Sequence, residues 1–460
     1  MKRLTLIAFA IVSIGAHQCA IAADKPNIIL IMADDFGYEC VAANGGHYNT
    51  PHLDQMAANG MRFEHCYVQP LCTPTRVQVM TGLYNVRNYF SFGKIDTKAT
   101  TFAHLLKDAG YATAVAGKWQ LGRAKNLPQH LGFDESALWQ HTRRPPRYAN
   151  PGLEYNGEEK DFTDGEYGPA LINDFAVDFI ARHKDEPFFL YYPMIETHAP
   201  FQPTPDSADW EPKARGEKLS DGKHYGEMIT YADKMVGRIE STLEKLGIRD
   251  NTLIIFCGDN GTSGKITSQF KGQDYRGGKG QATMRGMHVP LIVSWPGKVK
   301  GESINPNLVA STDFLPTICE AAGVRLPDSM PKDGHSFYAQ LLGEKTEPRE
   351  SLYCWYARGK AADDISEFAM TKERKLYRGG RFFDLVADPQ EKQARQVADL
   401  QGTDGVVALE LQAVLDQYAD ARPSDVKRAT ANAAAEPQRE RPRRRRGPRQ
   451  RAARANADQP

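Results

Sequence analysis

The sequence NIILIMADD, from Asn27 to Asp35, decides the fold class. It opens with a continuous apolar run, which is typical of a strand buried on both faces of a parallel sheet. Runs of the same character follow at 111–116, 187–194, 252–257 and 289–295. Amphipathic helical patterns lie between them, at 101–109, 171–183 and 226–246. Strands that alternate with helices predict an α/β fold with a large mixed, mainly parallel sheet flanked by helices.

Four of the predicted strands end in polar residues that can take part in chemistry. In chain order these residues are Asp34, Asp35, Lys118, His198, Asp259 and Asn260. Each strand end alone has an ordinary explanation, because Asp and Asn terminate strands and form turns. Parallel strands, however, bring their carboxyl ends to one edge of the sheet, where ligands of open α/β folds bind. Together these residues predict one polar crevice.

The acidic residues predict a divalent cation in that crevice. Asp34, Asp35 and Asp259 offer carboxylates, and Asn260 offers an amide oxygen. All-oxygen ligation suits calcium, at roughly 2.3–2.6 Å per bond, or magnesium with more waters, whereas zinc prefers His and Cys. Without a cation, buried carboxylates repel one another and take up protons.

Cys72 lies at the predicted start of a helix. Pro74 favours the first helical turn, where its missing N–H costs nothing. The N-terminus of a helix favours an anion, and Arg76 can offer two parallel hydrogen bonds to an oxyanion from one turn further on. The pattern leaves two alternatives open: a buried structural cysteine, or a thiolate nucleophile activated by the helix end and Arg76.

The N-terminus predicts export. Lys2 and Arg3 precede an apolar run, and Ala20-Ile21-Ala22 forms an A-x-A cleavage signal. We interpret residues 1–22 as a secretory signal peptide, so the mature chain would be periplasmic or secreted. The apolar run is too short for a good membrane span, and no later stretch predicts a transmembrane segment. Lipid attachment at Cys19 is a less favoured alternative.

Signal-peptide cleavage would leave six cysteines. They are Cys40, Cys66, Cys72, Cys257, Cys319 and Cys354. Six cysteines in an exported chain could all pair, but their spacing shows no dense disulfide framework. If Cys72 has a special role, at least one of the other five stays free.

The net charge of +1 conceals a basic C-terminus. From Pro423 to Pro460 the chain has eleven Lys or Arg and four Asp or Glu, which leaves −6 for the rest. We predict that residues 422–460 form a disordered basic tail, since almost no bulky apolar residue follows Val426. Such a tail could bind nucleic acid, acidic polysaccharide or a membrane surface, although a solvated tail with no specific nucleic-acid partner is the favoured interpretation.

The Pro-rich stretch 326–332 marks a domain junction. We therefore predict a catalytic domain over residues 23–325 and a smaller C-terminal subdomain over 326–421. Alternating runs around Gly379-Gly380 indicate a hairpin in that subdomain.

The chemical motifs occur in the order of a known family. Cys72-Thr73-Pro74-Thr75-Arg76, followed by Thr81-Gly82, resembles the signature of the type I sulfatases of the alkaline phosphatase superfamily. Other resembling motifs are Asp34-Asp35-Phe36-Gly37, Gly117-Lys118-Trp119, Thr197-His198-Ala199-Pro200, Gly258-Asp259-Asn260-Gly261 and Gly278-Lys279-Gly280. The resemblance spans about residues 26–390. It implies an alkaline phosphatase-like sheet and a small C-terminal antiparallel sheet with one helix.

The resemblance also implies a sulfuric ester hydrolase and assigns roles to its residues. A formylglycine-generating enzyme would convert Cys72 to formylglycine during export, and a hydroxyl of the aldehyde hydrate would attack sulfur. One calcium ion would be ligated by Asp34, Asp35, Asp259, Asn260 and the modified Cys72. Arg76 and Lys118 would hold the hydrate and the sulfate. His198 and Lys279 would bind sulfate oxygens and assist departure of the alcohol. The expected substrate is a sulfated carbohydrate rather than a small aryl ester.

Gln120 departs from the family pattern, which often has a histidine at this substrate-binding position. Glutamine donates hydrogen bonds but does not act as a base at neutral pH. Two other functions stay open, the first because phosphate and sulfate share shape and the second because of Gln120. One is a phosphodiester or phosphonate hydrolase on the same scaffold. The other is a non-catalytic sulfated-glycan-binding protein in which Cys72 stays a thiol.

An aromatic stretch from Trp139 to Tyr148 also contains Arg143, Arg144 and Arg147. These residues could line a subsite for a sulfated sugar, but they could equally form a solvated loop.

Overall fold

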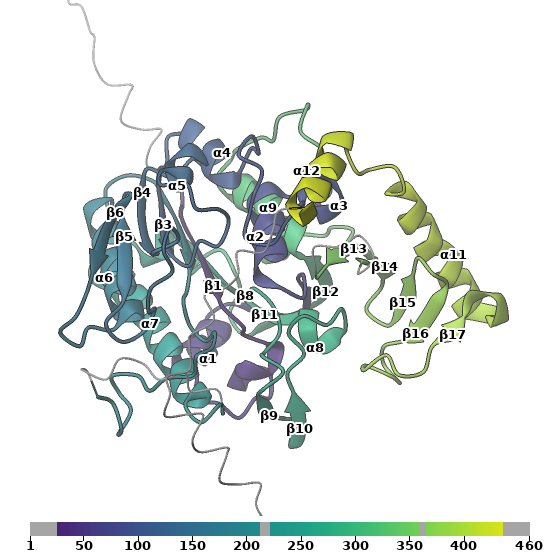
Figure 1. Ribbon diagram of the computed structural model, residues 1–460, viewed down its shortest axis with the longest axis horizontal. Helices are drawn as coiled ribbons and strands as arrows, with labels where there is room; N and C mark the ends of the chain where they lie inside the picture. The colour runs from purple at the N-terminus through teal and green to yellow at the C-terminus, as the bar shows by residue number, and fades with distance from the viewer. Residues whose placement is uncertain (1–24, 212–220, 359–364, 436–460) are drawn as a thin grey trace, which may run out of the picture.

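The computed structural model describes residues 25–211, 221–358 and 365–435. The predicted signal peptide, the Cys19 alternative and residues 436–460 of the basic tail lie outside this part of the chain. A central sheet lies between two layers of helices, and a smaller sheet with helix α11 lies beside it (Figure 1).

Within the described residues, ten strands form the central sheet, in the order β12-β2-β11-β8-β1-β7-β3-β4-β5-β6. Their bounds are β1 Asn27–Ala33, β2 Met61–Tyr67, β3 Ala112–Gly117, β4 Glu135–Trp139, β5 Gly152–Tyr155, β6 Glu158–Asp161, β7 Phe188–Pro193, β8 Thr252–Gly258, β11 His288–Ser294 and β12 Ser303–Ala310. Strands β8, β1, β7, β3 and β4 pair in parallel, whereas β11 is antiparallel to both of its neighbours. The predicted mixed, mainly parallel sheet is confirmed, and each predicted apolar run forms one of its strands.

Helices cover both faces of this sheet. One layer contains α1 Pro51–Ala58, α6 Gly168–Arg182 and α7 Tyr225–Lys245, and the other contains α2 Cys72–Thr81, α4 Phe102–Asp108 and α9 Phe314–Ala321. Side chains of β1 alternate between the two cores: Ile29 and Ile31 pack with the first layer, and Leu30 packs with the second. Because both faces are buried, the strand is apolar at nearly every position.

Short elements connect the layers. They are η2 Tyr38–Cys40, η3 Ala42–Asn44, α3 Asn85–Asn88, α5 Leu127–His130, η4 Arg249–Asn251, the hairpin β9 Thr267–Phe270 and β10 Gln273–Arg276, α8 Met284–Met287, η5 Ser311–Asp313, α10 Tyr338–Leu341 and η6 Val397–Asp399.

The C-terminal sheet is small and antiparallel. Its strands are β13 Leu352–Ala357, β14 Ile365–Met370, β15 Arg374–Tyr377, β16 Arg381–Asp384 and β17 Arg395–Gln396. Strands β15 and β16 form the predicted hairpin, and α11 Gly402–Gln417 packs on the sheet through Leu411 and Leu415. The predicted small sheet with one helix is therefore confirmed, while the domain boundary at 325/326 stays a prediction.

The first part of the basic tail is helical, so the prediction of disorder from residue 422 onward is wrong there. Helix α12 spans Ser424–Ala435, and Val426 is buried. Arg422 stacks on Trp355, with its guanidinium carbon 4.3 Å from the ring centroid. Arg422 also donates to the carbonyl oxygens of Val86 and Tyr89, at 3.1 and 3.0 Å. Alanine favours a helix, and this local preference prevails over the low apolar content of the whole tail.

All six cysteines in the described part of the chain are buried and free of disulfides: Cys40, Cys66, Cys72, Cys257, Cys319 and Cys354. Among the described residues, no helix has the length and apolar character that crossing a membrane requires.

Gly117 closes β3 directly before Lys118, and we expect its replacement by alanine to destabilise the fold. Its φ is 129°, and a Cβ atom would lie 1.9 Å from the Pro193 carbonyl oxygen, which accepts a hydrogen bond from the Lys118 amide. Backbone strain and the clash should together lower the free energy of unfolding by about 3 kcal/mol or more. Thermal denaturation of Gly117→Ala measures this loss. The control is Gly247→Ala, because Gly247 has a φ of 69° but open space around it. Equal melting temperatures for the two variants would contradict the prediction.

Candidate active site

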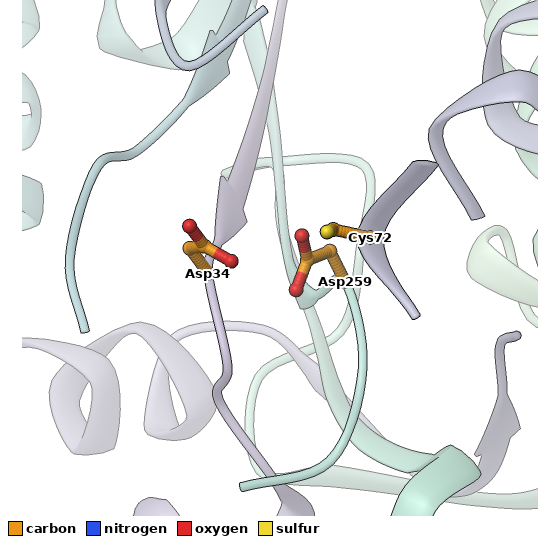
Figure 2. Close-up of side chains that lie close together, drawn as sticks. All are labelled: Asp34, Cys72 and Asp259. Atoms are coloured by element: carbon orange, nitrogen blue, oxygen red, sulfur yellow. The ribbon is translucent and has the colours of Figure 1, made fainter. Parts of the chain in front are cut away.

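The ends of β1 and β8 meet the first turn of α2 at the carboxyl edge of the central sheet (Figure 2). One ligand atom from each of Asp34, Cys72 and Asp259 lies within 4.8 Å of the other two. All three side chains are buried. The structure therefore brings together the predicted nucleophile and two of the predicted metal ligands.

Two buried cations neutralise the carboxylates of this cluster. Lys118 Nζ donates to Asp34 Oδ2 at 2.6 Å, and Arg76 Nη2 donates to Asp259 Oδ2 at 2.8 Å. Arg76 also donates from Nη1 to the Lys118 carbonyl oxygen at 2.9 Å. The guanidinium thus ties helix α2 to the ends of β3 and β8.

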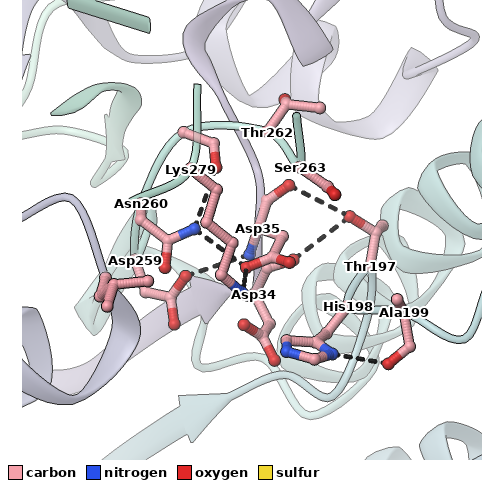
Figure 3. Close-up of polar contacts among 12 residues, drawn as sticks. Asp34, Asp35, Thr197, His198, Ala199, Asp259, Asn260, Thr262, Ser263 and Lys279 are labelled. Carbon is pink, nitrogen blue, oxygen red and sulfur yellow. Dashed lines mark hydrogen bonds and ion pairs between the residues drawn. The ribbon is translucent and has the colours of Figure 1, made fainter. Parts of the chain in front are cut away.

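Asp35 and Asn260 extend the network on the same sheet edge (Figure 3). Asn260 Nδ2 donates to Asp35 Oδ1 at 2.9 Å, and Lys279 Nζ forms an ion pair with the same oxygen. The Asp35 amide donates to Asp259 Oδ1 at 3.0 Å. These contacts gather the remaining predicted metal ligands around the first two.

Two buried oxygens of the network have no hydrogen-bond partner: Asp34 Oδ1 and Asn260 Oδ1. A buried acceptor without a partner costs roughly 1–3 kcal/mol. Both atoms are oxygen ligands of the kind that calcium and magnesium prefer. The residues present therefore fit a divalent cation.

The two strand-end carboxylates differ in proton affinity. Burial raises the pKa of Asp34, but the nearby charge of Lys118 prevails and holds that pKa well below its usual range. Burial, followed by the charge of Asp34, raises the pKa of Asp259 to about 6. A bound cation would favour ionisation of both groups.

His198 follows β7 and lies beside the acidic residues (Figure 3). Its Nδ1 lies 2.6 Å from the Ala199 carbonyl oxygen, which can only accept, so Nδ1 carries the hydrogen. Burial lowers the pKa of His198 to about 4, although Asp35 and Asp34 oppose this shift. The neutral ring therefore has Nε2 available as a proton acceptor, and Figure 3 shows this nitrogen turned toward Asp34.

Cys72 is the first residue of α2, as the position of Pro74 predicted. Burial raises the pKa of its thiol above the ordinary value, although Lys118 and Lys279 oppose the shift. The surroundings therefore favour a neutral thiol, and they do not support the alternative of an activated thiolate.

Gln120 lies next to the start of α2. Its carbonyl oxygen accepts a hydrogen bond from Thr73 Oγ1 at 3.3 Å, and its φ is 54°. The side-chain Oε1 is buried and has no hydrogen-bond partner. The amide thus has a free acceptor beside the residue that follows Cys72.

Sequence reasoning missed two residues that fix the turn after β1. Tyr225 Oη donates to the Asp35 carbonyl oxygen at 2.9 Å, and Thr197 Oγ1 donates to the Asp34 carbonyl oxygen at 3.2 Å. Both hydrogen bonds are accepted by backbone carbonyl oxygens, so no charge or spacing pattern in the sequence predicts them. The Thr197-His198 motif gave the only sequence signal, and it pointed to the histidine.

Comparison with known proteins identifies relatives of the whole catalytic region. The family model described as "Sulfatase" matches residues 26–324, and "N-sulphoglucosamine sulphohydrolase, C-terminal" matches residues 282–418. The chain is 31% identical over 412 residues to arylsulfatase A of Homo sapiens, covering 80% of this chain and 78% of the relative. It is 28% identical over 464 residues to N-acetylgalactosamine-6-O-sulfatase of Bacteroides thetaiotaomicron, covering 80% and 89%. The crystal structure of Ps i-CgsB has a TM-score of 0.73 at 25% identity, covering 90% of this chain and 98% of that chain.

These matches confirm the predicted family and the predicted fold, whereas the role of each site residue stays a prediction. The first model alone spans well over half of the chain. The chain is therefore an enzyme that hydrolyses sulfate esters, and it belongs to the type I sulfatase family of the alkaline phosphatase superfamily.

Proposed function

We propose that this sulfatase removes sulfate from a sulfated carbohydrate, with Cys72 converted to formylglycine and one calcium ion bound beside it. The observation that carries the proposal is the buried cluster of Cys72 with Asp34 and Asp259. A cysteine needed only for packing has no reason to lie between two buried carboxylates, one of which, Asp34, carries an unpartnered oxygen.

The calcium ion would be held by Asp34, Asp35, Asp259, Asn260 and residue 72. When bound, it supplies positive charge that polarises the sulfate and stabilises a deprotonated nucleophile. Lys118 donates to Oδ2 of Asp34, and Arg76 donates to Oδ2 of Asp259. Both carboxylates are therefore oriented before an ion binds.

Formylglycine at position 72 would supply a hydrated aldehyde whose hydroxyl is the nucleophile. Arg76 holds a full positive charge one helical turn away, and its side chain is 0% exposed. Because Asp259 and the Lys118 carbonyl fix this guanidinium, its charge needs no rearrangement when charge develops on sulfate oxygens.

Lys279 and His198 differ in protonation state. Burial opposes the charge on Lys279, but Asp35 prevails and raises the pKa of the ammonium group above its usual value. Lys279 therefore stays protonated, so that it can bind a sulfate oxygen and place its N–H groups near the departing alcohol. His198 has the complementary role, because its neutral Nε2 accepts a proton.

A carbohydrate substrate is supported by the names of the relatives. One bacterial relative is an N-acetylgalactosamine-6-O-sulfatase, and the mouse relative is an N-acetylgalactosamine-6-sulfatase that is 30% identical over 387 residues. The proposal also includes export, cleavage near Ala22 and maturation by a formylglycine-generating enzyme. N-terminal sequencing of protein recovered from its own host tests the cleavage.

Mass spectrometry of the peptide that contains residue 72 tests the nucleophile. The expected result is conversion of the thiol to an aldehyde in protein matured by its own host. Turnover of matched sulfate and phosphonate esters then tests the reaction, and faster hydrolysis of the phosphonate would favour the alternative hydrolase. An intact thiol, under conditions that convert a control sulfatase, would contradict the proposal.

Gln120→His is expected to change turnover by less than about tenfold. General-base catalysis contributes roughly 10²–10⁴-fold, and His198 Nε2 already supplies a neutral acceptor in this site. The measurement is kcat for an aryl sulfate, with the aldehyde content of each preparation determined in parallel. A rise of several orders of magnitude would show that the wild-type enzyme lacks its base. Gln120→Glu is the matched variant, since it keeps the shape and adds a titratable oxygen.

A further inference from the structure

The arginine-rich loop between Trp139 and Tyr148 contains two kinds of arginine. Arg143 forms ion pairs with Glu159 and Asp161, both at 2.7 Å. Among the described residues, no acidic side chain forms an ion pair with Arg123, Arg144 or Arg147. Arginine side chains on a protein surface are readily paired, so three unpaired ones in one place call for an explanation.

Arg144 lies close to the nucleophile. Its Nη2 is 3.7 Å from the position that a Cβ atom on Gly93 would take. The Gly93 amide in turn donates to Thr73 Oγ1 at 3.1 Å, and Thr73 directly follows Cys72. The same hydroxyl donates to the Gln120 carbonyl oxygen, three residues before Arg123. One short chain of contacts therefore connects Arg144 to the first turn of α2.

Arg147 is held in place from the other side of the loop. Its guanidinium carbon lies 4.0 Å from the ring centroid of Trp139, whose Nε1 donates to the Pro145 carbonyl oxygen at 2.9 Å. The next residue, Tyr148, donates from Oη to the His198 carbonyl oxygen at 2.5 Å. Arg147 Nη1 is buried and has no hydrogen-bond partner. A charged donor without an acceptor is costly, and an oxyanion would satisfy it.

Arg123 and Arg147 both act on Arg144. Burial, followed by the positive charges of Arg123 and Arg147, lowers the pKa of Arg144, while Cys72 has the opposite effect. Like charges that face one another destabilise the free protein. A ligand with a negative group would relieve this repulsion, and the contacts through Gly93 and Thr73 place that group beside the first turn of α2.

We propose that Arg123, Arg144 and Arg147 form a second anion subsite, which binds an additional sulfate or carboxylate group of the substrate. The inference rests on the proposed function and narrows it to sugars with two anionic groups, either on one residue or on adjacent residues. The scissile sulfate occupies the buried site of Lys118 and Lys279, and the second group lies at the arginines.

Binding of charge-matched sugars tests this subsite. The probes are N-acetylgalactosamine 6-sulfate, its 4,6-disulfate, and the disaccharide in which an uronate precedes N-acetylgalactosamine 6-sulfate. Calorimetry of the full chain with calcium measures each Kd. We expect the Kd of at least one doubly anionic probe to be about tenfold or more below that of the monosulfate. One hydrogen bond to a charged group is enough to lower a Kd by about tenfold. The disulfate and the uronate probe distinguish a sulfate from a carboxylate as the second group.

The affinity ratio is the Kd of the monosulfate divided by the Kd of a doubly anionic probe. In the double variant Arg144→Gln/Arg147→Gln this ratio should fall close to one. Arg143→Gln is the matched control, since this arginine is paired away from the site, and it should keep the wild-type ratio. A wild-type ratio near one for both doubly anionic probes, or an unchanged ratio in the double variant, would overturn the subsite. Turnover of 4-nitrophenyl sulfate is measured separately, so an enzyme that binds but does not hydrolyse contradicts the proposed function rather than this inference.

Discussion

Cys72→Ala is expected to lower kcat/KM for an aryl sulfate by about 10⁵-fold or more, because loss of a nucleophile removes the covalent route that the rest of the site supports. The fold should survive. The substitution removes one buried sulfur atom, which costs roughly 1 kcal/mol, and that sulfur makes no hydrogen bond within the described part of the chain. Steady-state kinetics and thermal denaturation of the same preparation separate the two effects.

The matched control for this variant is Cys66→Ala. Cys66 is equally buried, in strand β2, but it lies outside the cluster of Asp34 and Asp259. It should lose a similar amount of stability and keep most of its activity. If Cys72→Ala kept more than about a hundredth of wild-type activity, the nucleophile would have to be another group.

Removal of the divalent cation is expected to lower activity by about 10³-fold and to lower the melting temperature without unfolding the protein at room temperature. An ion that binds only the folded state stabilises it by about 2.7 kcal/mol at a hundred times its Kd. The folded state should persist after chelation, because Lys118, Lys279 and Arg76 already neutralise the three carboxylates. Titration of calcium into chelated protein, followed by activity and by melting temperature, measures both effects.

Asp34→Asn separates the effect of calcium binding from the effect of a general loss of stability. The variant should lose bound calcium, measured by elemental analysis, and its melting temperature should no longer respond to added calcium. Asp233→Asn is the control, since Asp233 is buried, accepts the amide hydrogens of His52 and Leu53, and lies outside the cluster of Asp34, Cys72 and Asp259. It should lose stability and keep its calcium. Full calcium occupancy in Asp34→Asn would contradict the assignment of the free Asp34 Oδ1 as a ligand.

The sequence predicted the central strands well because burial on both faces imposes a continuous apolar run. The direction of β11 could not be predicted, since a strand buried on both faces looks the same whether it is parallel or antiparallel. Helix α12 was missed because composition was averaged over a long tail, whereas the helix depends on a short alanine-rich segment and on contacts of Arg422 with distant residues.

The candidate site was predicted as a set of residues but not as a network. Strand ends identify Asp34, Asp35 and Asp259, because topology alone brings such ends together. Which oxygen stays free depends on the orientation of the Asn260 amide, and no spacing pattern specifies that. Similarly, Arg143 and Arg144 are adjacent and chemically identical. Only the structure shows that one is paired, while the other has a φ of 62° and lies near Gly93.

The burial of Cys72 constrains when the proposed modification of this residue can take place. Its side chain is 1% exposed and is fixed in the first turn of α2, so a second protein cannot reach the thiol once that helix has packed on β1 and β8. The proposed modification must therefore precede the packing of this helix. Under this proposal, the active fraction of each preparation would depend on two rates, that of enzymatic oxidation and that of chain collapse. A molecule that folds first would stay inactive although it is natively folded.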